Sequence, residues 1–455
     1  MAKIISINPA TEEINKEFEL YSKEQVVKIC KDSRKAFKEW KNLDIKERGN
    51  YLRNLADVLR RKKEEYGRLI TIEMGKPIKQ GVAEVEKCAW TAEVYADNGE
   101  KWLEEELVQA DGKKHIVTFE PLGVILSVMP WNFPFWQALR FGIPTLTAGN
   151  VSILRHSNVV PMCALTIEEA FKEAGFPENV FRTIITDHKL VASLIRSDLI
   201  NGVTVTGSVG VGSRVGQLAG KYIKKFVLEL GGSDPFVVLE DANIQFACKS
   251  AAQGRLINSG QSCIAAKRFI VVKEIAEEFT EKFVEFTKAL KVGNPLEQDT
   301  DVGSLVNEQQ RQLLEAQVKD AVDKGATVLT GGKRIEGRGF FYEPTILSNV
   351  KKNMKVVKEE VFGPVAPIIV VKNEKEAIRV ANDSEFGLGA SVWSTNEEGV
   401  IRVARALQAG AVFVNGIVKS DPRLPFGGIK KSGIGRELSH YGLKEFVNIK
   451  AINIY

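Results

Sequence analysis

Two side chains in the sequence could carry out acyl-transfer chemistry, the thiol of Cys263 and the carboxyl group of Glu229. Cys263 ends the segment Asn-Ser-Gly-Gln-Ser-Cys at residues 258–263, and Glu229 lies in Leu-Glu-Leu-Gly-Gly at residues 228–232. The small residues on both sides leave room for a carbonyl group to approach the sulfur. We therefore interpret the pair as a nucleophile and its base. The alternative is an inert core thiol, the commoner fate of an isolated cysteine.

The composition of the chain is typical of a soluble enzyme with more than one domain. The 455 residues are 44% hydrophobic and 27% charged, with a net charge of +5. Such a small positive excess does not indicate a nucleic-acid partner. No run reaches the ~20 apolar residues of a membrane span, and the N-terminus lacks a signal-peptide pattern. We expect a cytoplasmic protein with no membrane partner.

The cysteines and histidines give no sign of a disulfide framework or a metal site. Five cysteines are scattered along the chain without a Cys-x-x-Cys pair, which indicates a reducing compartment. Four histidines are scattered too, and none stands at a metal-ligand spacing from Cys or Glu. We expect no metal. The cysteines other than Cys263 lie in helical patterns and are expected to be core or surface thiols: Cys30, Cys88, Cys163 and Cys248.

The elements that position these residues alternate between strand and helix. Helical apolar spacing over 24–61 is followed by short apolar runs separated by helical stretches, which predicts a parallel α/β sheet. These strand candidates are 116–119, 123–129, 151–154, 180–185, 202–206 and 226–230. A second alternation predicts a second α/β domain, with strand candidates at 236–239, 268–272, 326–329 and 365–371. Glu229 and Cys263 straddle the changeover, so we expect the chemistry in a cleft between domains.

Two further segments suggest ligand sites. Asn132 follows the buried strand 123–129, where open α/β sheets place ligand groups, and its amide could stabilise an oxyanion together with the Cys263 backbone N–H. The alternative for Asn132 is a local turn cap. The glycine-rich segment 203–212 precedes a helical pattern, and a helix N-terminus favours phosphate. Its glycines do not have the GxGxxG spacing, so an ordinary tight turn is the alternative.

Taken together, six ordered motifs resemble the aldehyde dehydrogenase superfamily from about residue 6 to the C-terminus. They are Pro-Trp-Asn-Phe-Pro (130–134), Thr-Gly-Ser (206–208), Leu-Glu-Leu-Gly-Gly (228–232), 258–263 with Arg268, Glu-Val-Phe-Gly-Pro (360–364), and Pro-Phe-Gly-Gly (425–428) leading to Ser432-Gly433. The resemblance implies an α/β fold with a Rossmann-like cofactor domain (1–103 and 122–231), a catalytic domain (232–436) and a β-strand oligomerisation extension (104–121 and 437–455).

The resemblance also implies a role for each motif residue. Cys263 would attack the aldehyde, Asn132 would donate to the oxyanion, and Glu229 would direct water onto the thioester after hydride transfer to nicotinamide. Cofactor contacts would come from two groups of residues. Glu360 would hold the nicotinamide ribose, Phe362 would pack beside the nicotinamide and Ser208 would contact the pyrophosphate, and further contacts are implied at Trp131, Arg155, Ser157, Asn158, Gly207 and Leu230.

Two departures from the family pattern concern cofactor choice. The usual Lys-Pro-[Ser or Ala]-Glu segment is Arg-His-Ser-Asn at residues 155–158. Asn158 replaces the glutamate that bonds the ribose hydroxyls in NAD-dependent relatives, whereas Arg155 keeps a cation near the adenosine ribose. A carboxylate would repel a 2′-phosphate, so we expect NADP to be preferred, with dual specificity for NAD as the alternative.

The helix after Asn132 bears on substrate choice, because Gln137 and Arg140 stand where relatives that oxidise apolar aldehydes carry apolar or aromatic residues. A desolvated arginine calls for an anion, so the hypothesis is an aldehyde with a distal carboxylate. The alternative is a Glu or Asp partner elsewhere in the chain. Arg140 and Ser420 also match residues of succinate semialdehyde dehydrogenases, although a second arginine of many of those enzymes is Ile257 here, with Arg255 two positions earlier.

Other readings of the same motifs remain open at this point. The substrate could be another small aldehyde, charged or uncharged. An acylating dehydrogenase that uses coenzyme A is a rival which the presence of Glu229 disfavours, and a structural or binding protein on this fold would be expected to lack Cys263, Glu229 or Asn132. Segments 113–119 and 447–454 alternate polar and apolar, and each would leave an open sheet edge in a monomer. By resemblance such edges pair between subunits, which predicts a homodimer or homotetramer.

Overall fold

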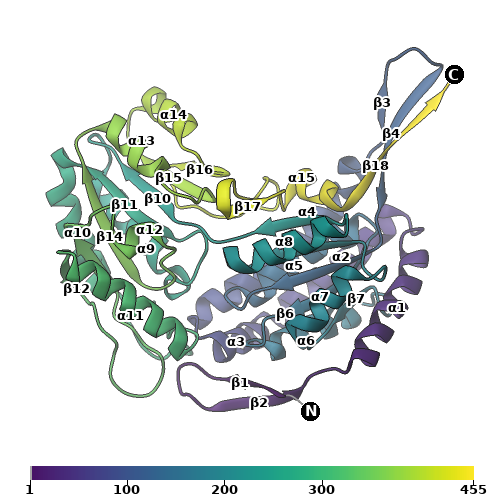
Figure 1. The fold of residues 1–455 in the computed structure, drawn as a ribbon, viewed down its shortest axis with the longest axis horizontal. Helices are drawn as coiled ribbons and strands as arrows, with labels where there is room; N and C mark the ends of the chain where they lie inside the picture. Colours follow the sequence, from purple (N-terminus) through teal and green to yellow (C-terminus); the bar gives the residue numbers. More distant parts are fainter. Residues whose placement is uncertain (1–2) are drawn as a thin grey trace.

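The computed structural model describes residues 3–455, and its strands form four sheets. Figure 1 shows two lobes, each built on one large sheet, and an arm of three strands that projects away from both. Within the described residues, no helix is long and apolar enough to cross a membrane. The two large sheets confirm the predicted α/β fold class and its two alternations of strand and helix.

The first large sheet has six strands. In spatial order they are β17 (Gly433–Ile434), β9 (Lys225–Glu229), β8 (Gly202–Thr206), β5 (Val124–Met129), β6 (Val151–His156) and β7 (Phe181–Thr183). All neighbours pair in parallel except β17, which is antiparallel to β9. The intervening helices are α5 (Pro134–Thr147), α6 (Pro161–Glu173), α7 (His188–Arg196) and α8 (Val209–Lys221). Every residue of β5 and β6 is buried, which explains the nearly continuous apolar run of β5.

The direction of strand addition reverses between β5 and β8. After β5 the chain adds β6 and β7 on one side, then returns to add β8 and β9 on the other. Ligands of open α/β sheets bind at the carboxyl ends of the strands beside such a reversal. The segments that leave β5 and β8 there contain Asn132 and Ser208, so the topology itself brings these two predicted residues to one crevice.

The second large sheet has seven strands and supplies the nucleophile. In spatial order they are β12 (Thr327–Thr330), β13 (Thr345–Ser348), β14 (Val365–Val371), β11 (Ala266–Val272), β10 (Asp234–Val238), β15 (Gly389–Trp393) and β16 (Ala411–Val414). Only β12 runs antiparallel to its neighbour. Its helices are α9 (Ile244–Leu256), α10 (Ala276–Lys288), α11 (Glu308–Asp323), α12 (Lys355–Lys358), α13 (Glu374–Asn382) and α14 (Glu397–Ala406). Cys263 lies between α9 and β11.

Four helices precede the first large sheet: α1 (Lys23–Trp40), α2 (Ile45–Arg61), α3 (Lys63–Met74) and α4 (Ile78–Trp102). The helical spacing over 24–61 correctly predicts α1 and α2. Each begins with a capping box, Ser22 with Gln25 and Asp44 with Glu47, which satisfies backbone amides that would otherwise lack partners. The longest helix, α4, packs on α2, α3 and α5 and reaches the site described below.

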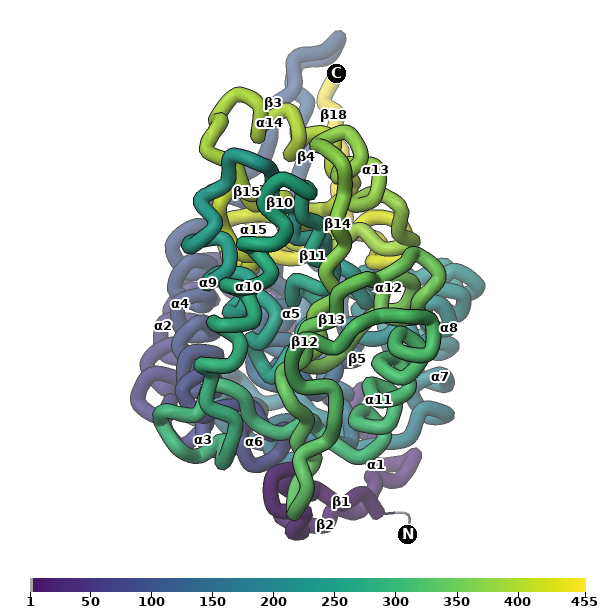
Figure 2. Tube along the Cα trace, turned by 90° about the vertical axis from the view of Figure 1, so that its left-hand side faces the viewer, coloured from purple at the N-terminus to yellow at the C-terminus, as the bar shows by residue number. Residues whose placement is uncertain are grey.

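An N-terminal hairpin of β1 (Lys3–Ile7) and β2 (Ile14–Glu19) joins the two lobes at their base. Its turn contacts a loop of the second lobe, where the backbone N–H of Phe340 donates to the Pro9 carbonyl at 2.9 Å and that of Gly339 donates to Glu12 Oε1 at 2.8 Å. Figure 2, which looks onto the second lobe, shows the hairpin at one end of the molecule and the arm at the other.

The arm corrects one expectation drawn from the sequence. It consists of β3 (Glu106–Val108), β4 (Lys114–Pro121) and β18 (Val447–Ile454), and β18 pairs with β4 along its whole length, from Val447 opposite Pro121 to Ile454 opposite Lys114. The expectation that segment 113–119 leaves an open edge is therefore wrong, because β4 is the middle strand. The open edges of the arm belong to β3 and β18.

Candidate active site

A cavity of about 240 Å³ brings the predicted nucleophile and the predicted substrate residues together. Cys263 lines it beside Ser262, and Phe133, Trp136, Gln137 and Arg140 line it from α5 or the residue before it. Ser420, from the segment after β16, and Lys87, from α4, are among the other polar residues of the wall. The sequence did not single out Lys87. Lys87 lies in none of the recognised motifs, so the residues around it give no signal of a site.

The loop before Cys263 has an uncommon backbone. Asn258, Ser259 and Gly260 have φ values of 54°, 54° and 76°, in the left-handed region that L residues rarely adopt. A side chain at Gly260 would have its Cβ 2.3 Å from the carbonyl carbon of Gly363, so glycine is required there. Strained backbone of this kind persists where the surrounding structure fixes it, and here it fixes the nucleophile loop against the 360–364 motif.

Asn132 contacts this loop directly. Its side-chain Nδ2 donates to the Gln261 carbonyl at 3.2 Å, while Nδ2 of Asn258 donates to the carbonyls of Asn132 and Gln261 at 2.8 and 2.9 Å. The amide of Asn132 is thus held two residues from Cys263, and its second N–H remains to be donated. Because Gln261, the partner of the Asn132 side chain, lies far along the chain, the arrangement fits an oxyanion donor better than a cap of a local turn.

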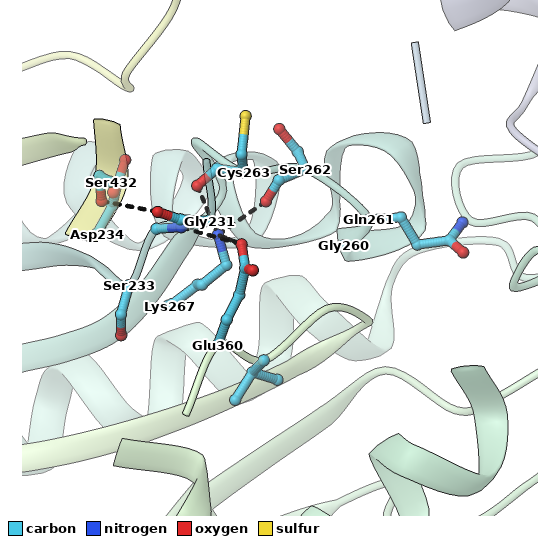
Figure 3. Close-up of polar contacts among 12 residues, drawn as sticks. Gly231, Ser233, Asp234, Gly260, Gln261, Ser262, Cys263, Lys267, Glu360 and Ser432 are labelled. Atoms are coloured by element: carbon cyan, nitrogen blue, oxygen red, sulfur yellow. Dashed lines mark hydrogen bonds and ion pairs between the residues drawn. The ribbon is translucent and has the colours of Figure 1, made fainter. Parts of the chain in front are cut away.

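Lys267 holds the nucleophile loop from below, as Figure 3 shows. Its ammonium donates to the carbonyls of Ser262 at 2.8 Å and Cys263 at 2.7 Å, and lies 3.6 Å from Glu360 Oε1. The Cys263 sulfur points away from this network. Burial lowers the pKa of Lys267, while Glu360 opposes that shift. The sequence analysis missed Lys267, although a lysine inside a strand as apolar as β11 is an available signal of a buried polar network.

Glu360 and Phe362 lie where a nicotinamide ribose and ring could be held. Glu360 Oε1 accepts a hydrogen bond from the Gly232 backbone N–H at 3.0 Å, and a Cβ at Gly231 would come 2.4 Å from its Oε2. The rings of Phe362 and Trp131 meet edge to face at 5.6 Å. These predicted cofactor residues come from motifs far apart in the sequence and are gathered at the Cys263 loop.

The other predicted cofactor residues lie at the carboxyl ends of β6 and β8, except for Leu230, which follows β9. Ser208 caps α8, accepting from the Val211 N–H at 3.4 Å, and a Cβ at Gly210 would meet nothing within 4 Å, so the first amides of α8 are open to a phosphate. Arg155 donates to the Thr186 carbonyl at 3.1 Å and to Asn158 Oδ1 at 3.0 Å. Because both acceptors are neutral, the guanidinium charge stays available for an anion, which fits a phosphorylated dinucleotide.

Glu229 is buried at the end of β9, and neither of its carboxyl oxygens accepts a hydrogen bond from residues 3–455. Gly427 leaves the space for this carboxyl group, because a Cβ there would lie 2.6 Å from Glu229 Oε1. Burial, and then the charge of nearby Glu437, raise the pKa of Glu229 well above its usual value. A raised pKa makes the carboxylate a stronger base, which suits the role predicted for Glu229.

Arg140 has the kind of partner that the sequence analysis gave as its alternative. Its guanidinium forms a buried ion pair with Glu437, donates from Nη2 to Thr206 Oγ1 at 3.2 Å and lies 4.7 Å from the centre of the Phe426 ring. Its charge is therefore already balanced. Arg255 does not line the cavity, because it is buried among backbone carbonyls, including those of Ala266 and Gly260.

The thiol of Cys263 is protonated at rest. Its surroundings raise its pKa to about 11, mainly through burial, and the charges of Arg140 and Lys267 oppose that shift. A proton must therefore leave the sulfur when it attacks. In the described part of the chain, no group of three or more His, Cys, Asp or Glu side chains is arranged to hold a metal ion.

A thiol, an amide donor and a buried carboxyl group beside a dinucleotide crevice define a class of cysteine-dependent oxidoreductase. The family model described as "Aldehyde dehydrogenase family" matches residues 2–452. A protein of Synechocystis sp., named a probable succinate-semialdehyde dehydrogenase (NADP+), is 47% identical over 99% of each chain. The chain belongs to the aldehyde dehydrogenase family, which confirms the resemblance found in the motifs.

Two further relatives agree with this membership. Escherichia coli succinate semialdehyde dehydrogenase (NAD(P)+) Sad is 43% identical over 98% of this chain and 97% of that protein. The solved structure of succinic semialdehyde dehydrogenase from Streptococcus pyogenes, in complex with NADP+, has a TM-score of 0.97 at 36% identity and covers 99% of each chain.

Proposed function

We propose that this aldehyde dehydrogenase oxidises succinate semialdehyde to succinate and prefers NADP over NAD. The observation that carries the proposal is that the cavity at Cys263, although most of its wall is apolar, also contains amide, hydroxyl and cationic side chains. Gln137, Arg140 and Ser420 form its substrate end. The named activities of the relatives from Synechocystis sp. and E. coli support the same substrate.

The residues of the site divide the reaction between them. Cys263 releases its proton to the solvent and attacks the aldehyde carbon, and the developing oxyanion accepts hydrogen bonds from the Asn132 side chain and the Cys263 backbone N–H. A nicotinamide cofactor, when bound, supplies the hydride acceptor. Glu229 then takes a proton from the water that hydrolyses the thioester on Cys263, and its raised pKa makes it a stronger base for this step. Lys267 keeps the nucleophile loop in place throughout.

The preference for NADP rests on Arg155 and Asn158. Arg155 supplies a permanent charge held by neutral acceptors, and Asn158 supplies no carboxylate that would repel a 2′-phosphate. The Streptococcus pyogenes structure with NADP+ bound supports this assignment. In the same proposal, residues 1–103 and 122–231 form the cofactor domain and 232–436 the catalytic domain.

The proposal includes a homo-oligomeric assembly and a cytoplasmic location. The arm, 104–121 and 437–455, would join subunits through the open edges of β3 and β18, giving a homodimer or a dimer of dimers. Leu107 and Ile449 on those strands are 73% and 61% exposed, an apolar surface that a partner subunit would cover. All five cysteines are free, as expected in a reducing cytoplasm.

Initial rates with succinate semialdehyde and with butanal, an uncharged aldehyde of equal length, test the proposal with each cofactor. We expect NADP to be favoured, and the charged aldehyde to be favoured in kcat/KM by about a hundredfold or more. Equal rates with the two aldehydes would retain the aldehyde dehydrogenase chemistry but remove succinate semialdehyde as the substrate. A large stimulation by coenzyme A would instead favour the acylating reaction.

A further inference from the structure

Lys87 places an ammonium group in the wall of the substrate cavity. The side chain comes from α4, and its Nζ donates to Ser420 Oγ at 2.6 Å and lies 4.1 Å from the centre of the Trp136 ring. Both neighbours also line the cavity. A neutral hydroxyl and an aromatic face orient the ammonium but do not neutralise it.

The charged groups around Lys87 are already paired with one another. No carboxylate of residues 3–455 lies within ion-pair distance of its Nζ. Glu84, one turn away on α4, accepts from the backbone N–H groups of Phe135 and Trp136 at 2.9 Å each. The pairs that surround Lys87 are Arg140–Glu437, Lys76–Glu84 and Arg423–Asp421.

Lys87 is half-buried, and a partly desolvated cation without a counter-ion is unfavourable. In a binding cavity such a cation favours an anionic ligand. Desolvation lowers the pKa of Lys87 to about 8, and Arg140 adds to the effect while Asp421 opposes it. The charge of Arg140 is balanced by Glu437, and the third cation of the cavity wall, Lys419, is exposed to solvent. Lys87 is therefore the cation of the wall that is both partly removed from solvent and without an ion-pair partner among residues 3–455. Its contact with Ser420 presents an ammonium and a hydroxyl side by side.

We propose that Lys87, together with Ser420, binds the distal carboxylate of the aldehyde and is the residue that selects charged over uncharged substrates. The inference rests on the proposed function and names the group that reads the carboxylate. Arg140 then acts as a positioning residue that joins α5 to Glu437. The alternative is that Lys87 only anchors the segment that contains Ser420. In that case the charge of Lys87 would not affect the choice between the two aldehydes.

The test compares Lys87→Met, Lys87→Arg and the native enzyme with succinate semialdehyde and with butanal. Loss of a charged hydrogen bond should lower kcat/KM for the charged aldehyde by about 10- to 100-fold, mostly through KM, with butanal changed less than about twofold. Lys87→Arg should restore much of the preference. Lys101→Met, on an exposed residue of the same helix, is the matched control.

A second measurement needs no variant. Below pH 8 Lys87 is charged, and above it the charge is lost, so KM for succinate semialdehyde should rise above about pH 8 in the native enzyme while KM for butanal does not. In Lys87→Arg this rise should move out of the accessible pH range, because a guanidinium stays protonated. A purely structural role would produce neither effect.

The outcomes separate the two proposals. If the native enzyme favours the charged aldehyde but Lys87→Met weakens both aldehydes equally, or neither, and KM shows no selective rise above pH 8, the inference about Lys87 is overturned and the proposed function stands. If the native enzyme shows no preference for the charged aldehyde, the proposed substrate is wrong and the role of Lys87 falls with it.

Discussion

Arg140 and Glu437 form an ion pair in the interior of the protein, with side chains 2% and 3% exposed. Glu437 is held in place by two backbone hydrogen bonds of 2.7 Å that it exchanges with Phe426, the residue whose ring lies against Arg140. The motif Pro-Phe-Gly-Gly at 425–428 therefore positions the partner of the arginine on α5. The pair also lies close to Glu229. The charge of Glu437 raises the pKa of Glu229, and the charge of Arg140, on α5, lowers it.

Breaking this pair should cost stability more than selectivity. Arg140→Met leaves Glu437 buried without a counter-ion, which should lower the free energy of unfolding by about 3–5 kcal/mol. The double variant Arg140→Met/Glu437→Met removes both charges and should lose less than the sum of the single variants. Denaturant unfolding of the native protein, Arg140→Met, Glu437→Met and the double variant measures this. Additive losses, or a single-variant loss below about 1 kcal/mol, would contradict a coupled pair.

Glu437 should also set the pH range of catalysis. Its charge raises the pKa of Glu229, so Glu437→Gln lowers that pKa and lets Glu229 lose its proton at a lower pH. The acid limb of the kcat profile should move to lower pH. Glu385→Gln, which removes an exposed partner of Lys431, is the control. An acid limb that stays in place or moves to higher pH would show that Glu437 does not act on the base.

A single carboxylate should reverse cofactor choice. Asn158→Glu places a negative charge beside Arg155, where it would repel a 2′-phosphate and compete for the guanidinium. We expect kcat/KM for NADP to fall by about tenfold or more while that for NAD is kept or improved. Asn158→Gln adds the same length without the charge and should retain NADP. Equal losses for both cofactors in Asn158→Glu would mean that position 158 does not face the 2′-position.

Much of the fold follows from local sequence pattern. Strands β5, β6, β8 and β11 are predicted because each contains a short run rich in apolar or β-branched residues, as expected of strands that are buried on both faces. Strands β13, β15, β16 and β17 were not predicted, since they are short and are defined by their pairing partners. The pairing of β18 with β4 was missed for the same reason: the partner is at the other end of the chain.

The residues of the site likewise fall into those that the sequence predicts and those that only the structure shows. Cys263, Glu229 and Asn132 can be found in the sequence because each lies in a distinctive local motif. Lys87 and Glu437 could not, because each matters through a contact that only the folded chain creates. The role of Arg140 was open for that reason, and its ion pair with Glu437 is what the tertiary structure adds.

The most direct test of the account is to trap the acyl group on Cys263. In Glu229→Gln the thiol can still attack, but water is no longer activated, so kcat with succinate semialdehyde and NADP should fall by about 10²- to 10⁴-fold. The first turnover should still release one reduced cofactor per active site, and mass spectrometry should find one succinyl group on the peptide that contains Cys263. Absence of both the burst and the modified peptide, in a variant that binds NADP normally, would contradict the division of roles between Cys263 and Glu229.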